Sequence, residues 1–581
     1  MGIYWRGQVG VGHSQTRVQN RILLQPTFGG GGRQTLTPTD PVKRLALEGE
    51  ILALLAKQAI TRVPEETGPL FRSSFFLTKK RDGTWRPILN LKPLNTKHIR
   101  PKHFRMETLN LILPLLRKGM WAATVDLRDA YLHILIHKEH RRFLAFRYAE
   151  QDYQFRALPF GLATAPRTFT RVAGAVVAYL RKRGVTLYVY LDDWLVVGNS
   201  LSEATNNVHK TLQTLQELGW IVNQKKSRLS PSQTIQFLGA ILDFTTGVAR
   251  PSEERVAAVK ATTQQILAHR GSPTGTWLRA LGLMASLVDI VRLCRLHMRP
   301  LQLHLLRSAD PTDPDKTTLI YRSEEVTQHF RWWLDPNNWS SGVPFAIQLP
   351  MTSITTDASL SGWGAHWSNR TAWGTWSQTE TSLHINILEM MAVKRALEAF
   401  NDHVQGTITT IFTDNTTVVA YINRQGGTRS ERLCRLAWEV ITAAEDSGTI
   451  LRASHIAGKL NVMADALSRG HIDPNEWSLE QETCDRIFSI FGRPTIDLFA
   501  THKNNKLQTF CSRRFHPLAY HTDAMSLSWD HMDAYIFPPL CMIGQVLRKI
   551  RNSKGRFTLI APFWPRRPWF AEIPNSSWTS Q

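Results

Sequence analysis

Two adjacent acids, Asp192 and Asp193, interrupt a run of β-branched, aromatic and aliphatic residues at positions 186–198 (TLYVYLDDWLVVG). The run predicts a tight hairpin with both acids at its apex. Adjacent carboxylates repel each other, and Asp-Asp forms a weaker hairpin turn than Asn-Gly, so the pair favours a site for a divalent cation. A plain acidic turn between two strands is the alternative, because Asp is common in turns.

A third acid of this kind lies upstream. Asp126 ends the strand-like first part of MWAATVDLRDAYLHILI (residues 120–136), and Tyr131 follows just beyond it. Asp126 is therefore a candidate third carboxylate for the same site as the hairpin acids.

Four further carboxylates occur in order between residues 350 and 470. Asp357 lies in an alternating strand (ITTDASLSGWGAHW), and Glu389 lies beside the apolar stripe of a predicted helix (NILEMMAVKRALEAF). Asp414 ends the strand TITTIFTDN, and Asp465 comes ten residues after His455 in HIAGKLNVMADALSR. Each acid alone is typical of a helix cap or a charged surface position, so a functional interpretation depends on the ordered set.

Length and composition limit the fold and the partner. The chain has 581 residues, which is enough for about three to five domains with cores of their own. The apolar fraction of 43% argues against general disorder, and no apolar run approaches the roughly 18 residues of a membrane span. A formal charge of +23 predicts a polyanionic partner, and nucleic acid is the expected class.

The cysteines and the N-terminus bear on the compartment. The five cysteines are scattered without a CxxC pair, so we expect reduced thiols and no structural zinc. The N-terminus lacks the apolar core of a signal peptide. These features predict an intracellular protein, in the cytoplasm, the nucleus or both.

A basic stretch follows the N-terminal region. Residues 1–40 are rich in Gly, Gln and Thr and predict a loose leader, whose GGGG run is not a phosphate loop because no Lys-Ser/Thr follows it. Between residues 79 and 105, nine Lys or Arg residues stand against one acid, and Asp82-Gly83 marks a hairpin turn. This hairpin is typical either of a phosphate-gripping element or of a solvated charged face, and the sequence leaves both open.

Six motifs in order resemble the polymerase domain of retroelement reverse transcriptases over roughly residues 65–245. They are TKKRDGTWRP, VDLRDAY, LPFGLATAP, YLDD, NQKKS and FLG. Phe160 in LPFG resembles the residue of gypsy-like, pararetroviral and DIRS-type elements. YLDDWLVV and the downstream segments fit the DIRS-type retrotransposons, which encode a tyrosine recombinase.

The resemblance implies how the first three carboxylates act. Asp126 and Asp192 would bridge two Mg²⁺ ions, or Mn²⁺ ions, and Asp193 would be the supporting acid beside the primer end. Such ions lower the pKa of the primer 3′-hydroxyl and neutralise the triphosphate.

The resemblance also assigns residues to the nucleotide. Tyr131 matches the aromatic gate that excludes a ribose 2′-hydroxyl, with a packed core tyrosine as the alternative. Lys80 and Arg86 match the pair that binds the triphosphate, and Arg suits bidentate phosphate contacts. Lys226 matches the lysine near the leaving pyrophosphate. The expected partners are an RNA template, a DNA primer, the RNA–DNA hybrid and dNTPs.

Residues 350–470 are similar to retroelement ribonuclease H. The resemblance implies that four carboxylates hold two Mg²⁺ ions that activate water to cut the RNA strand of a hybrid. His455 would assist product release or proton transfer. The implied metal ligands are Asp357, Glu389, Asp414 and Asp465.

The segment 471–581 contains FGRPTIDLFATHKNN, TDAMSLSWD, AYIFPPL and GRFTLIAPFWPRRPWF in this order. In this order the motifs resemble a Dam-like adenine N6-methyltransferase, with an α/β nucleic-acid-binding domain of unrelated ancestry as the alternative. The family's Asn/Asp-Pro-Pro-aromatic motif is replaced by Phe537-Pro538-Pro539-Leu540, which has lost the polar and the aromatic end. We therefore expect a retained fold without methyl transfer. The basic, aromatic end PFWPRRPWF (Trp564, Arg566, Arg567, Trp569) predicts nucleic-acid binding instead.

The sequence thus predicts a multidomain α/β (α+β) protein: a right-hand polymerase with fingers, palm and thumb, then a ribonuclease H-like domain and a C-terminal α/β methyltransferase-like remnant. The expected division is a leader over 1–40, fingers and palm over 41–245, thumb and connection over 246–345, ribonuclease H over 346–470 and the remnant over 471–581. A catalytically silent or domesticated retroelement-derived nucleic-acid-binding protein is the rival hypothesis.

Overall fold

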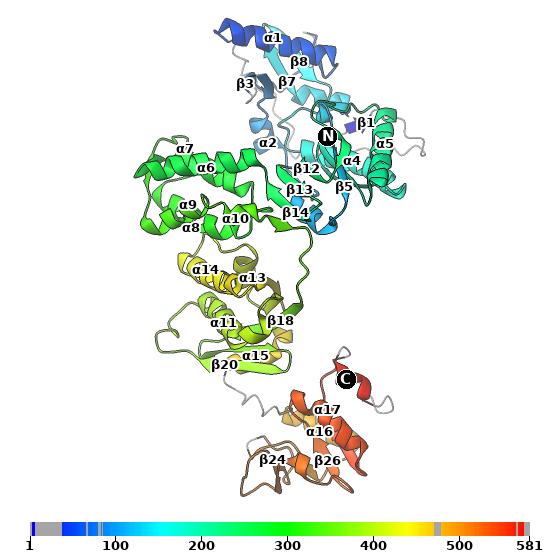
Figure 1. The fold of residues 1–581 in the computed structure, drawn as a ribbon, viewed down its shortest axis with the longest axis vertical. Coiled ribbons are helices and arrows are strands. Elements are labelled where there is room, and N and C mark those ends of the chain that lie inside the picture. Colours follow the sequence, from blue (N-terminus) through cyan, green and yellow to red (C-terminus); the bar gives the residue numbers. More distant parts are fainter. Residues whose placement is uncertain are drawn as a thin grey trace. The chain divides into compact units, whose positions relative to one another are not determined.

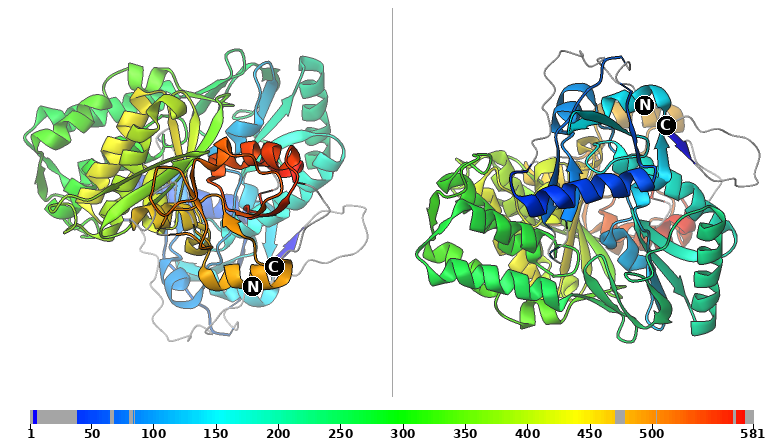
Figure 2. Two further views of the ribbon diagram at one scale, coloured as in Figure 1. Left: turned by 90° about the horizontal axis from the view of Figure 1, so that it is seen from below. Right: turned by 90° about the horizontal axis from the view of Figure 1, so that it is seen from above.

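The computed structural model describes residues 3–5, 38–64, 68–79, 83, 85–469, 478–502, 504–564 and 567–573. It is a mixed α/β structure (Figures 1 and 2). Its internal contacts divide the chain into two units. Unit 1 comprises residues 1–268, 282–292 and 331–347, and unit 2 comprises residues 269–281, 293–330 and 348–581. Of the leader expected over residues 1–40, only 3–5 and 38–40 belong to the described residues.

Helix α1 (Pro41–Ala56) of unit 1 begins at a polar cap. Asp40 Oδ1 accepts a hydrogen bond from the N–H of Val42 at 3.0 Å, which satisfies one of the free donors at the helix start. One face of α1 is buried in the core of the unit. The residues of this face are Leu47, Ile51 and Leu54.

The predicted basic hairpin is present as the antiparallel pair of β3 (Phe75–Lys79) and β4 (Trp85–Leu89). Gly83 between the strands has φ of 81°, a left-handed conformation that suits glycine in a turn. Two further small sheets accompany it. They are β2 (Ile60–Arg62), β8 (Gln151–Phe155) and β7 (Ala145–Tyr148), and the pair β1 (Ile3–Trp5) and β6 (Ile134–Ile136).

An antiparallel four-stranded sheet forms the centre of unit 1, with the order β11 (Arg228–Ser232), β5 (Trp121–Asp126), β10 (Asp193–Gly198) and β9 (Thr186–Tyr190). Strand β10 is buried from Trp194 to Gly198 because β5 and β9 flank it and α5 (Leu201–Glu217) packs on it. Helix α4 (Ala165–Lys182) packs against β9. This packing gives the two central strands a fixed register.

The remaining elements of unit 1 include a second four-stranded antiparallel sheet and several helices. The sheet has the order β12 (Thr234–Phe237), β13 (Ala240–Asp243), β14 (Val248–Pro251) and β17 (Val343–Pro344). The helices are α2 (Lys92–His98), α3 (Leu109–Ile112), α6 (Glu253–Ala268) and α10 (Asn337–Ser340).

Between residues 271 and 332 the chain is mostly helical. The elements are β15 (Gly271–Pro273), α7 (Thr274–Ala285), α8 (Cys294–Ser308), β16 (Leu319–Tyr321) and α9 (Glu324–Trp332).

A five-stranded mixed sheet is the centre of unit 2, with the order β20 (Arg370–Thr375), β19 (Gly362–Trp367), β18 (Met351–Ala358), β21 (Ile408–Thr413) and β22 (Ile450–His455). The first three strands are antiparallel neighbours, whereas β21 and β22 continue the sheet in parallel with β18. The accompanying helices are α11 (Ile385–Ala399), α12 (Asn401–Val404), α13 (Thr416–Asn423), α14 (Glu431–Asp446) and α15 (Val462–Ser468).

A glycine allows α15 to lie close to this sheet. A Cβ added to Gly364 on β19 would lie 2.4 Å from Leu467 Cβ and 2.5 Å from the carbonyl oxygen of Ala464. Only glycine fits this close approach, and it brings the end of α15 over β18 and β19.

The C-terminal part of unit 2 has two small parallel sheets. One has the order β23 (Ile496–Asp497), β26 (Asp533–Ile536) and β27 (Arg556–Leu559), and the other pairs β24 (Cys511–Ser512) with β25 (His521–Thr522). The helices are α16 (Gln481–Phe491) and α17 (Ile543–Arg551). Fully buried Trp529 lies in the hydrophobic core of this C-terminal part.

Among the residues that the structure describes, we find no helix with both the length and the apolar character that a membrane crossing requires.

Candidate active sites

The first predicted site lies at one end of the central sheet of unit 1. Asp193 is the first residue of β10 and is directly opposed to Asp126, the last residue of β5. On its other side Asp193 pairs with Tyr190, so the turn of the predicted hairpin consists of Leu191 and Asp192 alone. Asp192 thus lies in the turn itself, and Asp193 already belongs to the strand. The register places three carboxylates at one point of the sheet.

The turn is held by hydrogen bonds on both sides. Leu191 has φ of 54°, a left-handed conformation that costs a non-glycine residue roughly 1–2 kcal/mol. The indole Nε1 of fully buried Trp194 donates to the Leu191 carbonyl at 3.2 Å, and the N–H of Leu127 donates to the Asp192 carbonyl at 3.1 Å. These contacts keep the exposed carboxylate of Asp192 at the end of the hairpin.

Asp126 is held by the segment that carries the predicted lysine. Its N–H donates to Ser227 Oγ at 3.0 Å, and its carbonyl accepts from the N–H of Asn223 at 2.8 Å. Burial raises the pKa of the Asp126 carboxyl, while Lys226 and a hydrogen bond from Asn223 partly offset this effect and Asp192 adds to it.

Asp193 has the more strongly perturbed carboxyl of the two. Burial, with further contributions from Asp192 and Asp126, raises its pKa to about 6. Only Lys226 acts in the opposite direction among the principal influences. Burial and like charge therefore make it costly for Asp126 and Asp193 to be ionised at the same time. A bound cation would lower this cost.

Tyr131 lies on a 3₁₀ turn (Ala130–His133) close to these acids. Its ring centroid is 4.9 Å from that of Phe160 and 5.4 Å from that of Phe169. Burial, followed by the charge of Asp192, raises the pKa of Tyr131 to about 12, so its hydroxyl is neutral. The ring is half-buried. Its burial against the two phenylalanines is typical of a packed tyrosine, whereas its proximity to Asp192 is expected of a gate, so both alternatives stay open. Phe160, noted in the sequence only as a family feature, is its exposed partner.

The predicted nucleotide-binding cations are not all brought to one place. Lys226 lines the same cavity as Asp126 and Asp193. Arg86 lies exposed on β4 and does not line that cavity. Lys80 lies outside the described residues, so its predicted role stays a prediction.

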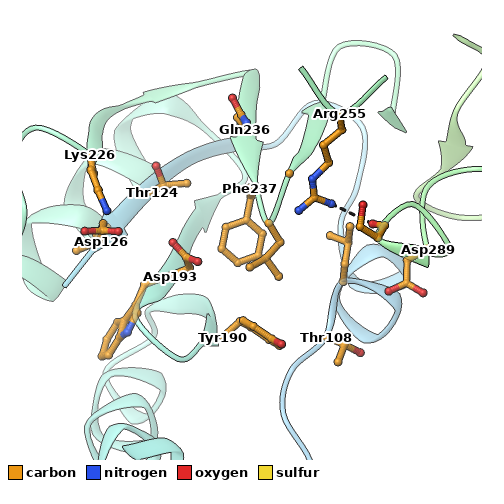
Figure 3. A pocket seen from close by; sticks show the side chains of 16 residues that line it. Thr108, Thr124, Asp126, Tyr190, Asp193, Lys226, Gln236, Phe237, Arg255 and Asp289 are labelled. Carbon is orange, nitrogen blue, oxygen red and sulfur yellow. Dashed lines mark hydrogen bonds between the residues drawn. The ribbon is translucent and has the colours of Figure 1, made fainter. Parts of the chain in front are cut away.

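A cavity of about 550 Å³ adjoins the carboxylates (Figure 3). Phe237, Arg255 and Asp289 lie on the side of the cavity away from Asp126 and Lys226 (Figure 3), and Gly239 is also among its lining residues. Arg255 Nη1 donates to the Ser286 carbonyl at 3.0 Å. The FLG motif (residues 237–239) contributes to the lining, although the sequence analysis predicted no cavity there, and it did not single out residues 255 and 289 at all. Their contribution depends on contacts between distant segments, which no local pattern encodes.

The second predicted site lies on the five-stranded sheet of unit 2. Asp357 is near the end of β18, Glu389 is on α11, and Asp414 follows β21. One oxygen of each carboxylate lies within 4.8 Å of one oxygen of the others, a spacing that could hold a metal ion. Burial raises the pKa of Asp357 to about 6 and, together with the two neighbouring acids, raises that of Glu389 to about 8.

Neutral donors orient Asp357. Ser468 Oγ donates to one carboxylate oxygen at 2.6 Å, and Asn461 Nδ2 donates to the other at 3.0 Å. Asn461 directly precedes α15 and Ser468 is its last residue, and α15 is the helix that Gly364 allows to approach the sheet. The sequence interpretation did not single out either donor, although Ser468 follows Asp465 at the three-residue spacing that places side chains on one helix face.

The fourth acid and the histidine are placed differently from the other three. The carboxylate of Asp465 pairs with Arg469 at 2.7 Å, and it is not a member of the group of three, although its charge raises the pKa of Asp357. His455 ends β22 and is exposed, in register with Thr413 on the neighbouring strand. The structure thus brings together three of the four predicted ligands.

In the C-terminal part, Asp497 ends β23 and is buried. Its two oxygens accept from the N–H groups of Phe499 at 3.2 Å and Lys506 at 3.0 Å, so they hold a loop of this chain. The FPPL sequence directly follows β26, the middle strand of the parallel sheet.

The basic, aromatic end is partly described. Arg567 lies over the ring of Trp564 at 5.5 Å, and Trp569 is 6.5 Å from the same ring. Arg566 lies outside the described residues.

Comparison with known proteins bears on the first site. Residues 78–242, which include Asp126, Asp192 and Asp193, match the family of reverse transcriptases (RNA-dependent DNA polymerases). The three acids of the first site therefore lie within the part of the chain that is similar to reverse transcriptases.

Two relatives illustrate the range of the similarity. The chain is 25% identical over 411 residues to the enzymatic polyprotein of Figwort mosaic virus, which covers 67% of this chain and 56% of that protein. It is 29% identical over 202 residues to the transposon Tf2-3 polyprotein of Schizosaccharomyces pombe, covering 35% of this chain and 15% of that protein. The chain thus spans about half of the first relative and a small part of the second.

Among solved structures, the chain is similar to the foamy viral protease-reverse transcriptase, which has been determined in complex with double-stranded DNA and with an RNA/DNA hybrid. For the complex with double-stranded DNA, the TM-score is 0.47 and the identity 19%, and the match covers 73% of this chain and 72% of that one.

The raised pKa of Glu389 predicts a pH-dependent effect of Glu389→Gln on stability. The unfolded chain loses this proton near pH 4.5, whereas the folded chain retains it up to about pH 8. The stabilisation that the protonated carboxyl provides is therefore complete below pH 4.5 and is lost as the pH rises to about 8. Without divalent cations, Glu389→Gln should become more stable than the wild type by about 1–3 kcal/mol as the pH rises through this window.

Urea unfolding of the full chain at pH 5 and pH 8, followed by tryptophan fluorescence, measures this difference. Mg²⁺ should stabilise the wild type more than the variant, because a ligand stabilises the state that binds it. Glu398→Gln is the matched control, since Glu398 lies exposed on the same helix α11. If the stability of Glu389→Gln and Glu398→Gln depends on pH in the same way, the carboxylate group does not cause the predicted destabilisation.

Proposed function

We propose that the protein is an RNA-directed DNA polymerase with ribonuclease H activity that copies retroelement RNA into DNA. The observation that carries the proposal is the direct pairing of Asp126 with Asp193, with Asp192 in the adjoining turn, inside a reverse transcriptase domain. Such an acid cluster at a strand end is suited to phosphoryl transfer.

The donor set fits a hard divalent cation. The three acids offer oxygen ligands only, two of them have raised pKa values, and Lys226 is the principal opposing charge near them. Two Mg²⁺ or Mn²⁺ ions bound there would neutralise the triphosphate and acidify the primer 3′-hydroxyl. Asp126 and Asp192 would be the bridging ligands, and Asp193 the supporting ligand.

The neighbouring side chains would bind and select the nucleotide. The neutral ring of Tyr131, supported by Phe160 and Phe169, would form a wall under the sugar that leaves no room for a 2′-hydroxyl. Lys226, which adjoins the acids, would bind phosphate of the leaving pyrophosphate. Lys80 and Arg86 on the basic hairpin would hold the triphosphate, in keeping with the hairpin's charge.

For residues 346–470 we propose ribonuclease H activity on the RNA strand of a hybrid. Support comes from the group of Asp357, Glu389 and Asp414. Two of these acids lie at the ends of neighbouring strands of the mixed sheet, and Glu389 lies on helix α11. Asp465 would complete the ligands once its carboxylate leaves Arg469, and His455 would assist proton transfer or product release.

The energetic cost of these sites argues against the silent, domesticated rival. A carboxyl with a pKa raised to about 8, as in Glu389, destabilises the folded chain at neutral pH unless a cation binds. A chain without catalytic constraint would gain stability by losing such acids. Both sets are complete in this sequence.

The assignment to a DIRS-type element extends this proposal. It is supported by YLDDWLVV, by Phe160 and by the extra C-terminal segment. Residues 41–245 would form fingers and palm, and residues 246–345 thumb and connection, which would hold the template and primer.

For the C-terminal segment we propose nucleic-acid binding without methyl transfer. Phe537 cannot accept a hydrogen bond from an adenine amine, and Leu540 offers no ring for stacking. Asp497, at the end of the first parallel strand, is engaged by backbone N–H groups of its own loop.

Asp192→Asn or Asp126→Asn should reduce DNA synthesis at least about 1000-fold, because each removes a bridging ligand of a cation that supplies several kcal/mol of transition-state stabilisation. Binding of primer–template should persist, because affinity comes mainly from Lys and Arg contacts to phosphate. Primer extension and fluorescence anisotropy test the two halves. Glu217→Gln, at an exposed position on α5, is the control, and full synthesis by Asp192→Asn would refute the site.

Tyr131→Val should allow ribonucleotides to be incorporated, because it removes the ring under the sugar while leaving the carboxylates in place. Competition between dNTP and rNTP during primer extension measures the discrimination, which should fall at least about tenfold, or 1.4 kcal/mol. Tyr131→Phe keeps the ring and should keep the discrimination. If Tyr131→Val discriminates as the wild type does, Tyr131 is only a packing residue.

Asp414→Asn should abolish cleavage of the RNA strand and spare DNA synthesis, because the two carboxylate groups belong to different units. A hybrid substrate labelled on its RNA strand measures cleavage, and primer extension by the same preparation measures synthesis. Asp446→Asn, at an exposed position on α14, is the control. Parallel loss of both activities would contradict the division into separate centres.

A further inference from the structure

A short surface loop in the C-terminal part of unit 2 exposes three large side chains. It covers residues 513–520 and joins β24 to β25. Phe515 is 82% exposed, Leu518 is 74% exposed and Tyr520 is 63% exposed. Apolar surface left in water forgoes about 25 cal/mol per Å² of burial energy, so three such side chains within one loop of eight residues indicate a binding surface.

The base of the loop is closed by backbone hydrogen bonds. The N–H of Tyr520 donates to the Phe510 carbonyl, and the N–H of Asp523 donates to the Ser512 carbonyl, both at 2.8 Å. The parallel pairing of β24 with β25 continues this closure. A compact loop of eight residues with adjacent ends has the form of an Ω-loop, a type of loop that is frequently functional.

The loop also has an anchoring side chain of its own. His516 stacks on His502 with 4.3 Å between ring centroids and 5° between planes, and its carbonyl accepts from the N–H of Ala519 at 3.0 Å. One ring of the loop is thus packed against the protein while Phe515 and Tyr520 stay in water. The exposure of these two rings is therefore a property of a formed loop.

The charge of the loop complements a phosphate backbone. Arg513 and Arg514 are adjacent and exposed. Within the described part of the chain, no carboxylate forms an ion pair with either guanidinium. Exposed aromatic rings beside unpaired arginines are the combination that binds single strands, because every unpaired base offers a face for stacking while the phosphates attract the cations.

We propose that residues 513–520 form a binding site for single-stranded nucleic acid. Phe515 and Tyr520 stack on unpaired bases, Leu518 packs between them against the strand, and Arg513 and Arg514 bind the adjoining phosphates. The site deepens the nucleic-acid-binding role proposed above for the C-terminal segment, on which it rests for the class of partner. It is distinct from the basic end that carries Trp564 and Arg567.

Photocrosslinking of the full chain locates this contact. The probe is an oligodeoxythymidine strand that carries 5-iodouracil, which links to aromatic rings stacked on it, and the crosslinked peptides are identified by mass spectrometry. Crosslinks should form at Phe515 and Tyr520. Unlabelled single strand should compete for them, whereas duplex of the same length should compete poorly because its bases are already stacked.

Paired variants separate the rings from the rest of the loop. Phe515→Leu with Tyr520→Leu keeps apolar side chains but removes the rings, and should lower crosslinking within the loop peptide and affinity at this site at least about fivefold. Phe515→Tyr with Tyr520→Phe keeps both rings and should bind as the wild type does. A second test leaves the rings in place and combines Arg513→Gln with Arg514→Gln. The slope of the logarithm of the binding constant against the logarithm of the salt concentration should fall by an amount that corresponds to about two phosphate contacts.

Three results would overturn the proposal. The first is crosslinking to peptides of the polymerase region with none to residues 513–520, which would reject this site and leave the polymerase proposal intact. The second is equal competition by duplex, which would exclude stacking on bases. The third is a dimer in sedimentation that Phe515→Ser dissociates without changing the crosslinks, which would make the loop a protein interface.

Discussion

The first candidate site depends on one constraint: the backbone register holds carboxylates together although they repel each other. Asp126 and Asp193 occupy directly opposed positions of β5 and β10, so neither can withdraw without breaking the pairing of two central strands. The charges of Asp126 and Asp192 contribute to the raised pKa of Asp193, which is the effect of this repulsion. Buried Trp194 and the hydrogen bonds of the turn and of Asp126 hold the arrangement against this repulsion.

The second carboxylate group reaches a similar electrostatic state by a different construction. Its acids come from a strand, a helix and a strand end rather than from paired positions, so side-chain contacts must fix them. Ser468 and Asn461 occupy both oxygens of Asp357, and they are in place because α15 approaches the sheet at Gly364. A glycine that carries no chemistry therefore helps determine the geometry of the centre.

The distribution of charge suits the two tasks of the proposed function, which are to bind nucleic acid and to catalyse phosphoryl transfer. Three acids lie together at the first site and three at the second, while the chain as a whole carries +23. Widespread cations bind phosphate regardless of sequence, and local anions create the need for a divalent ion where the chemistry is to occur. The proposed site at residues 513–520 would add stacking to this scheme, because its rings would contact bases rather than phosphates.

The sequence by itself indicated the hairpin of residues 186–198, the basic hairpin at Gly83 and the order of the acids, because these features depend on neighbours in the chain. Only the tertiary structure decided that Asp193 belongs to the strand and not to the turn, that Phe160 and Phe169 support Tyr131, and that Arg255 and Asp289 line the cavity. It also separated Asp465 from the other three acids by pairing it with Arg469. The physical reason is that alternation and turn chemistry are local, whereas register, close approach and burial arise between segments that are distant in the chain.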